Sequence, residues 1–208
     1  MKYRVAIIFT FLLIAGCSST KTVSKKGFSS EETKLIMNSD SLKPMRVYKI
    51  TSKTDSLLLR TKSSYIKPNP KNPVLKTFVK RLYVTVTDSM SLGVGVAAPQ
   101  VGISKNIIWV QRFDKENFPF EVYLNPEIVE YSEKKQTARE GCLSIPNRID
   151  TLNCRALTIK IEYDTMAGKH KSETVGNFTS VIFQHEIDHL NGILYLDHLK
   201  KETQDAKK

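Results

Sequence analysis

Residues 178–191 read FTSVIFQHEIDHLN, and this stretch decides how the rest of the chain is interpreted. The apolar residues 181–183 precede a polar motif, which predicts a half-buried helix. Residues four apart share one face of a helix, so His185 and His189 can bind the same metal ion. Glu186 lies next to the first histidine, where a carboxylate can accept a proton from a metal-bound water. The stretch therefore predicts a metallohydrolase centre rather than an exposed helix with two incidental histidines.

A metal ion held by these two histidines needs a third protein ligand. Metallopeptidases that take it from downstream use a glutamate or a third histidine, and both options are poor here. The only later glutamate is Glu202 in a polar tail, and Tyr195 stands where the extended motif has histidine. An upstream thiolate is the stronger candidate, and the segment EGCLSIP at residues 140–146 offers Cys142. The competing assignment for Cys142 is a disulfide with Cys154, which an oxidising compartment would permit.

The other elements predict an α+β fold, with antiparallel β-sheets packed around the central HExxH helix. Asn72 and Pro73 are a good helix start, and apolar residues then recur at helical spacing to about Met90. This predicts an amphipathic helix near the N-terminus of the domain. Short strand-like runs follow, with a hairpin turn at 167–169 between the last two. The runs are residues 106–111, 121–124, 128–131, 156–163 and 172–175.

Three segments together resemble the peptide deformylase family. They are GVGVAAPQ at residues 93–100, EGCLSIP at 140–146 and QHEIDH at 184–189. They follow one another in the family's order, and the resemblance covers about residues 70–198. It implies a metal-dependent enzyme that removes the N-formyl group from N-formylmethionyl peptides.

The resemblance implies a chemical role for each residue of these motifs. Glu186 would be the general base toward a metal-bound water and then the acid that protonates the departing amine. Gln100 and the backbone N–H of Leu143 would donate to the oxyanion that forms on the formyl carbonyl. Glu140 and Arg155 would form a supporting ion pair. The implied metal ligands are Cys142, His185 and His189, with water in the fourth position.

The resemblance also implies where the peptide binds. Gly93 and Gly95 have no side chains, so a peptide backbone can lie close to this segment. Apolar residues would line the pocket for the methionine side chain, although core residues look the same in sequence. These residues are Val94, Phe178, Val181 and Ile182.

The family resemblance implies one divalent metal ion, Fe²⁺, while Zn²⁺, Ni²⁺ or Co²⁺ suit the same ligands. An exported thiolate–iron site would be exposed to oxidation, which makes Zn²⁺ a second hypothesis. Two other functions stay open at this point. One is an envelope amidase or peptidase with another substrate, and the other is a lipid-anchored protein that binds peptides without turnover. The presence of both Glu186 and Gln100 disfavours the binding protein, which needs neither.

The N-terminus predicts export. Lys2 and Arg4 precede an apolar run at residues 5–15, which is too short to span a bilayer and has the length of a signal core. Small residues then precede Cys17, as in bacterial lipoprotein signals whose cysteine becomes lipid-modified. The alternatives are a cleaved signal without lipid and a cysteine that stands there by chance. These features predict a protein anchored by lipid to a membrane of the cell envelope, or a cytoplasmic enzyme if the signal is not used.

The chain of 208 residues is predicted to divide into four parts. These are a signal at 1–16, a lipidated flexible tether at 17–44, a catalytic domain at 45–200 and a polar basic tail at 201–208. The formal net charge is +11, with no basic stripe that interleaves with aromatic residues, so no nucleic-acid partner is expected. The expected partners are a formylated peptide and the membrane, and a monomer is assumed. His170 and His198 match no motif and are predicted to face solvent.

Overall fold

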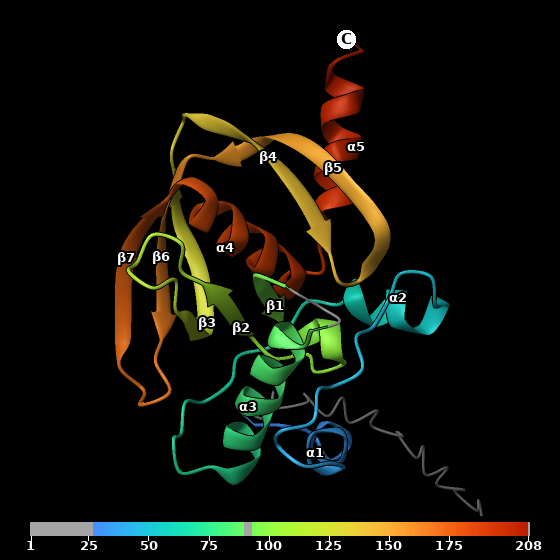
Figure 1. Ribbon diagram of the computed structural model, residues 1–208, viewed down its shortest axis with the longest axis vertical. Coiled ribbons are helices and arrows are strands. Elements are labelled where there is room, and N and C mark those ends of the chain that lie inside the picture. Colours follow the sequence, from blue (N-terminus) through green and yellow to red (C-terminus); the bar gives the residue numbers. More distant parts are fainter. Residues whose placement is uncertain (1–26, 90–92, 208) are drawn as a thin grey trace, which may run out of the picture.

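The computed structural model describes residues 27–89 and 93–207 (Figure 1). The predicted signal, the lipidation site Cys17 and the predicted helix end at Met90 lie outside these ranges. The described residues form helices and antiparallel sheets, which confirms the α+β class. The helices are α1 (Ser30–Met37), α2 (Lys53–Leu59), α3 (Pro73–Thr87), the 3₁₀ helix η1 (Ala98–Val101), α4 (Asn177–Leu190) and α5 (Tyr195–Asp205). The strands are β1 (Gly95–Ala97), β2 (Ile107–Gln111), β3 (Phe120–Tyr131), β4 (Lys135–Cys142), β5 (Ile145–Ala156), β6 (Thr158–Asp164) and β7 (His170–Gly176).

The strands form two sheets around α4. The larger sheet has the order β1-β2-β3-β6-β7, and each neighbouring pair is antiparallel. β4 and β5 pair only with each other in a two-stranded ribbon. Figure 1 shows this ribbon crossing above α4, with the larger sheet on the other side of the helix. Both β1 and β4 therefore have one edge without a strand partner in the described structure.

Helix α4 packs against the larger sheet through its apolar side. Its residues Phe183 and Ile187 are buried among side chains of the larger sheet, in a cluster that includes Ile108, Tyr123 and Ile161. Such burial stabilises by about 1.5–3 kcal/mol for each large apolar side chain. The helix ends before Gly192, which has a φ of 72°, and a Cβ there would overlap the carbonyl of Arg60. The opposite, polar side of α4 faces the ribbon.

The ribbon itself was not predicted from sequence. Apart from the start of the run at 156–163, which ends β5, neither strand has a predicted counterpart. The inward positions of these strands include the buried charged residues Glu140 and Arg155, which hide the usual alternation of apolar and polar side chains. The predicted runs at 121–124 and 128–131 are parts of one strand, β3, which is interrupted by a register shift next to Asn125.

The predicted flexible tether at 17–44 is contradicted where the structure describes it, from residue 27 onward. Residues 30–37 form helix α1, which begins with a capping box between Ser29 and Glu32. Ile36 is fully buried in the core formed with α3. The buried Arg81 of α3 donates hydrogen bonds to the carbonyl oxygens of Leu35 and Ile36, at the C-terminal end of α1. Because these contacts fix α1 to α3, the folded part begins before residue 45.

The predicted polar tail also differs, because α5 extends to Asp205. Tyr195 anchors the start of this helix and is 1% exposed. Glu202 accepts hydrogen bonds from the backbone N–H groups of Asn153 and Cys154, both at 2.9 Å. These contacts hold the helix along β5. None of the helices within residues 27–89 and 93–207 has the length and apolar character needed to cross a bilayer.

Candidate metal centre

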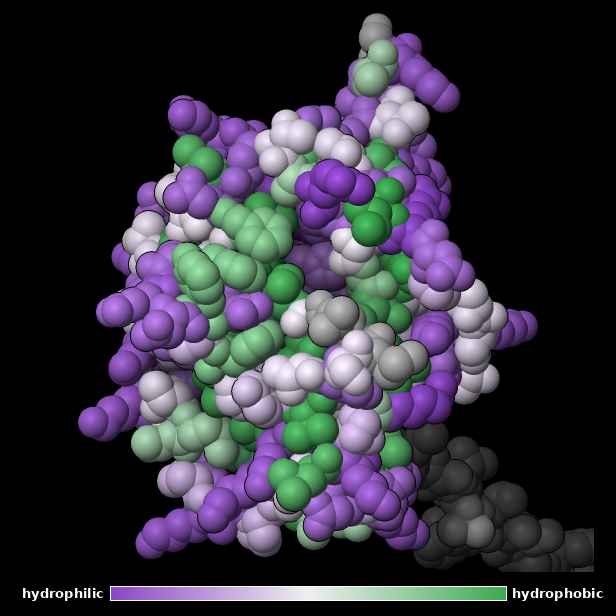
Figure 2. All heavy atoms as spheres, viewed as in Figure 1, coloured by the Kyte–Doolittle hydropathy of each residue, from purple (hydrophilic) through white to green (hydrophobic). Residues whose placement is uncertain are grey.

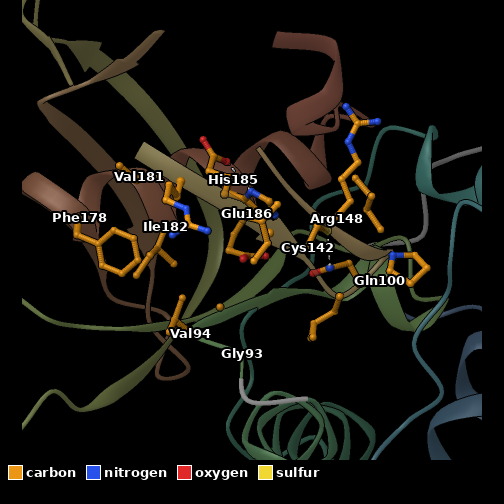
Figure 3. Close-up of a pocket in the computed structure, with 18 of the residues that line it drawn as sticks. Gly93, Val94, Gln100, Cys142, Arg148, Phe178, Val181, Ile182, His185 and Glu186 are labelled. Carbon is orange, nitrogen blue, oxygen red and sulfur yellow. Dashed lines mark hydrogen bonds and ion pairs between the residues drawn. The ribbon is translucent and has the colours of Figure 1, made fainter. Parts of the chain in front are cut away.

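Three side chains that can bind a metal ion meet where α4 faces the ribbon (Figure 3). Cys142 ends β4, and His185 and His189 project from successive turns of α4. One ligand atom from each lies within 4.8 Å of the others, and Cys142 Sγ is 3.2 Å from His189 Nε2. Cys142 and Cys154 are both free thiols, so the alternative of a disulfide between them is wrong.

A buried ion-pair network holds the first histidine. His185 Nδ1 lies 2.7 Å from Glu140 Oε2. Arg155 donates to both oxygens of Glu140, at 2.6 and 2.9 Å, and to Asp188 at 2.7 Å. Burial opposes ionisation of Glu140, but the bonds from His185 and Arg155 outweigh it and lower the pKa to about 2. A carboxylate at Nδ1 fixes the tautomer and leaves Nε2 of His185 available as a ligand.

The cluster fits a divalent metal ion. Burial opposes ionisation of the Cys142 thiol, but His189 and His185 outweigh it and lower its pKa well below the ordinary value. The site therefore offers a thiolate and two imidazoles, a donor set that suits iron, zinc and related ions. Buried Oε2 of Glu186, next to the cluster, has no hydrogen-bond partner among the described residues.

Glu186 lies between the three candidate ligands and strand β1. It is 4% exposed, and burial raises the pKa of its carboxyl to about 7. A Cβ placed on Gly95 would lie 2.5 Å from Glu186 Oε1 and 2.8 Å from Ile182 Cγ2. The Glu186 carboxylate therefore occupies space that any side chain at position 95 would fill. This requirement for glycine comes from a contact within the protein, and the sequence did not show it.

Gln100 is held with its amide nitrogen toward the cluster. Its Oε1 accepts a hydrogen bond from the N–H of Ala97 at 2.8 Å. Its Nε2 lies 3.5 Å from Cys142 Sγ and 3.3 Å from Ser144 Oγ. Leu143 lies between Cys142 and Ser144 in the sequence and lines the cavity described below. The amide N–H₂ of Gln100 and the backbone of Leu143 thus flank Cys142.

A cavity of about 750 Å³ opens onto this cluster. Figure 2 shows it as a hollow bordered by apolar side chains, and Figure 3 shows side chains of α4 that face it, with Val94 opposite them. All of the residues predicted to bind the peptide line this cavity. They are Gly93, Val94, Gly95, Phe178, Val181 and Ile182.

The β4–β5 ribbon adds lining residues that sequence reasoning missed. Arg139 and Ile149 face the cavity from β4 and β5, and Arg148 lies beside them. Because the ribbon was not predicted, nothing in the sequence placed these side chains near the histidines. The predicted exposure of His198 is also wrong, since it is half-buried and lies 2.8 Å from Asp188, whereas His170 is exposed as predicted.

Comparisons with known proteins show the family of the chain. The family model "Polypeptide deformylase" matches residues 47–205. A peptide deformylase of Desulforudis audaxviator is 39% identical over 155 residues, which cover 74% of this chain and 94% of that protein. A class I type b peptide deformylase of Acinetobacter baumannii, solved with Met-Ala-Ser bound, is similar with a TM-score of 0.64 and 32% identity. That match covers 74% of this chain and 98% of that one. The peptide deformylase of Thermotoga maritima gives a TM-score of 0.65 at 30% identity, covering 74% of this chain and 97% of that one. The chain therefore belongs to the polypeptide deformylase family of formyl-removing metallohydrolases.

Proposed function

We propose that the protein hydrolyses the formyl amide of N-formylmethionyl peptides, with Cys142, His185 and His189 as metal ligands and Glu186 as the group that moves protons. The observation that carries this proposal is the position of Glu186. Its carboxylate lies beside the ligand cluster and at the wall of a cavity of peptide size. A metal ion held there supplies Lewis acidity, which lowers the pKa of water and polarises a carbonyl.

Glu186 takes the proton of the attacking water and delivers it to the amine that leaves. A buried carboxyl with a pKa near neutrality is suited to both steps, because it gains and loses a proton with little cost at working pH. Gln100 Nε2 and the backbone N–H of Leu143 donate hydrogen bonds to the oxygen that becomes negative in the transition state. Since the Gln100 amide is already held by Ala97, it needs no reorientation when charge develops.

The peptide lies as an extended strand between the ribbon and the larger sheet. Within the described part of the chain, β1 and β4 each have one edge without a strand partner, so the backbone of a peptide can form hydrogen bonds with either strand. The methionine side chain enters the apolar part of the cavity beside α4. Residues Val94, Phe178, Val181 and Ile182 line that part.

A formate-release assay on formyl-Met-Ala-Ser tests the proposed reaction. The protein is purified without oxygen, its metal content is measured, and matched samples are loaded with Fe²⁺ or Zn²⁺. We expect formate release with about one metal ion per chain, and Fe²⁺ as the native ion, because the family resemblance implies it. Stoichiometric metal without any formate release contradicts the reaction. Release of another acyl group or amino acid instead of formate would identify an amidase or peptidase at the same site.

We further propose that the chain is exported and anchored to a membrane through lipid on Cys17. The support is the sequence alone, in which a charged start, a short apolar run and small residues precede Cys17. A Cys17→Ser variant is expected to move from the membrane fraction to the soluble fraction of cells. Recovery of the wild-type chain in the cytoplasm with residues 1–16 attached contradicts export.

A further inference from the structure

The acidic and basic residues that line the cavity lie at different depths. Two acidic side chains, Glu140 and Glu186, line it, and both are buried at its base. Glu140 is already neutralised by its ion pair with Arg155. The exposed charged lining residues are both cationic, Arg139 and Arg148. The outer part of the cavity therefore presents positive charge to a bound peptide.

The two arginines differ in their partners. Arg148 donates to both carboxylate oxygens of Asp150, at 2.6 and 3.2 Å, so much of its charge is already compensated. Arg139 has no carboxylate or hydrogen-bond partner for its side chain among the described residues. Its guanidinium is free to bind a carboxylate of the substrate, with a fork of N–H donors that fits both oxygens.

The position of Arg139 on β4 fixes which part of a peptide it can reach. It lies three residues before Cys142 on the strand, a distance of about 10 Å at 3.3 Å per residue. An extended peptide beside β4 advances at the same rate. Consider a peptide that runs antiparallel to β4 with its formyl group at Cys142. Its methionine then lies beside Gly141, its second residue beside Glu140 and its third residue beside Arg139.

We propose that Arg139 selects N-formyl peptides that carry a carboxylate on the third residue. This inference rests on the proposed function and names the class of substrate that the site prefers. Two sources supply such a carboxylate: an acidic side chain, or the free C-terminus of a tripeptide. A chain still attached to a ribosome has no free C-terminus, so the second source would favour short released peptides.

The test compares formate release from four peptides. Formyl-Met-Ala-Ser amide is the neutral reference, and formyl-Met-Ala-Lys amide is the cationic one. Formyl-Met-Ala-Asp amide carries the side-chain carboxylate, and formyl-Met-Ala-Ser with a free C-terminus carries the terminal one. For at least one carboxylate peptide we expect kcat/KM about two- to fivefold above the neutral reference, the size of a partly exposed ion pair. The gain should appear in KM, because Arg139 is remote from the formyl group, and it should shrink in 0.5 M salt.

Arg139→Gln is expected to remove the preference, and Arg139→Glu to reverse it in favour of the lysine peptide. Each is scored as a ratio to the neutral peptide, so a general loss of activity cancels. Lys160→Glu makes the same charge change on an exposed residue of β6 outside the cavity and should keep the wild-type ratio. A wild-type ratio of one for both carboxylate peptides, or a preference that survives Arg139→Gln, overturns the inference while the deformylase reaction stands. Absence of formate from all four peptides overturns the proposed function and this inference with it.

Discussion

A Glu186→Gln variant is expected to bind one metal ion per chain and to lose roughly 10²–10⁴-fold in kcat for formate release. The amide cannot accept a proton from water or return it to the amine. It has nearly the size and shape of the carboxylate, so it still fills the space in front of Gly95. Metal content by elemental analysis and kcat from the formate assay measure the two effects separately.

Glu127→Gln is the matched control for this variant, since Glu127 is exposed on β3 and lies outside the cavity. It should keep wild-type kcat and metal content. Unchanged kcat in Glu186→Gln removes Glu186 from the proton-transfer role. Loss of the metal together with activity would instead place Glu186 among the groups that hold the ion.

The centre was predictable because its residues lie close together in sequence or carry distinctive chemistry. His185 and His189 need only helical spacing to share a face, and α4 is the helix that provides it. The alternatives for a third ligand were few, and Cys142 lies in a recognisable motif. The structure brings these three side chains together.

The surroundings of the centre were not predictable for a physical reason. Arg139 and Arg148 reach the cavity only because β4 and β5 pair, and that pairing depends on contacts between residues far apart in the sequence. The inward face of the ribbon carries Glu140 and Arg155, whose burial is possible only as a pair. The pattern of apolar and polar residues is weakened in both strands, since each has a charged residue among its buried positions.

The order of helices α1 and α5, at the two ends of the domain, was also not predicted, because it depends on contacts with distant residues. Helix α1 is short and weakly apolar, and it is ordered by Arg81, which lies far away in sequence. Helix α5 has a polar sequence and is held by Tyr195 at its start and Glu202 near its end. Both segments look like solvated chain in isolation, because short helices gain most of their stability from tertiary contacts.

A Gly95→Ala variant is expected to fold and bind metal but to lose on the order of 10²-fold in kcat, the cost of a misplacement of about 1 Å in a reacting group. The backbone of Gly95 is in β1 and has no positive φ, so alanine causes no strain in the main chain. Its methyl group would lie 2.5 Å from Glu186 Oε1, and the carboxylate must move. Gly176→Ala is the matched control and should keep wild-type kcat and metal content, because Gly176 lies outside the cavity and its methyl group would meet Thr158 Cγ2 at 3.1 Å instead of a group of the site.

Combining Gly95→Ala with Glu186→Gln separates the two possible origins of that loss. If alanine acts by displacing the Glu186 carboxylate, it adds little to the loss in the Glu186→Gln background, because the group it displaces no longer transfers protons. If alanine instead blocks the peptide backbone at the edge of β1, it lowers kcat/KM by the same factor in both backgrounds. We expect the first result, since the contact with Glu186 is already closer than real Cβ contacts allow before any substrate binds. Equal losses in both backgrounds would contradict this and assign Gly95 to substrate binding alone.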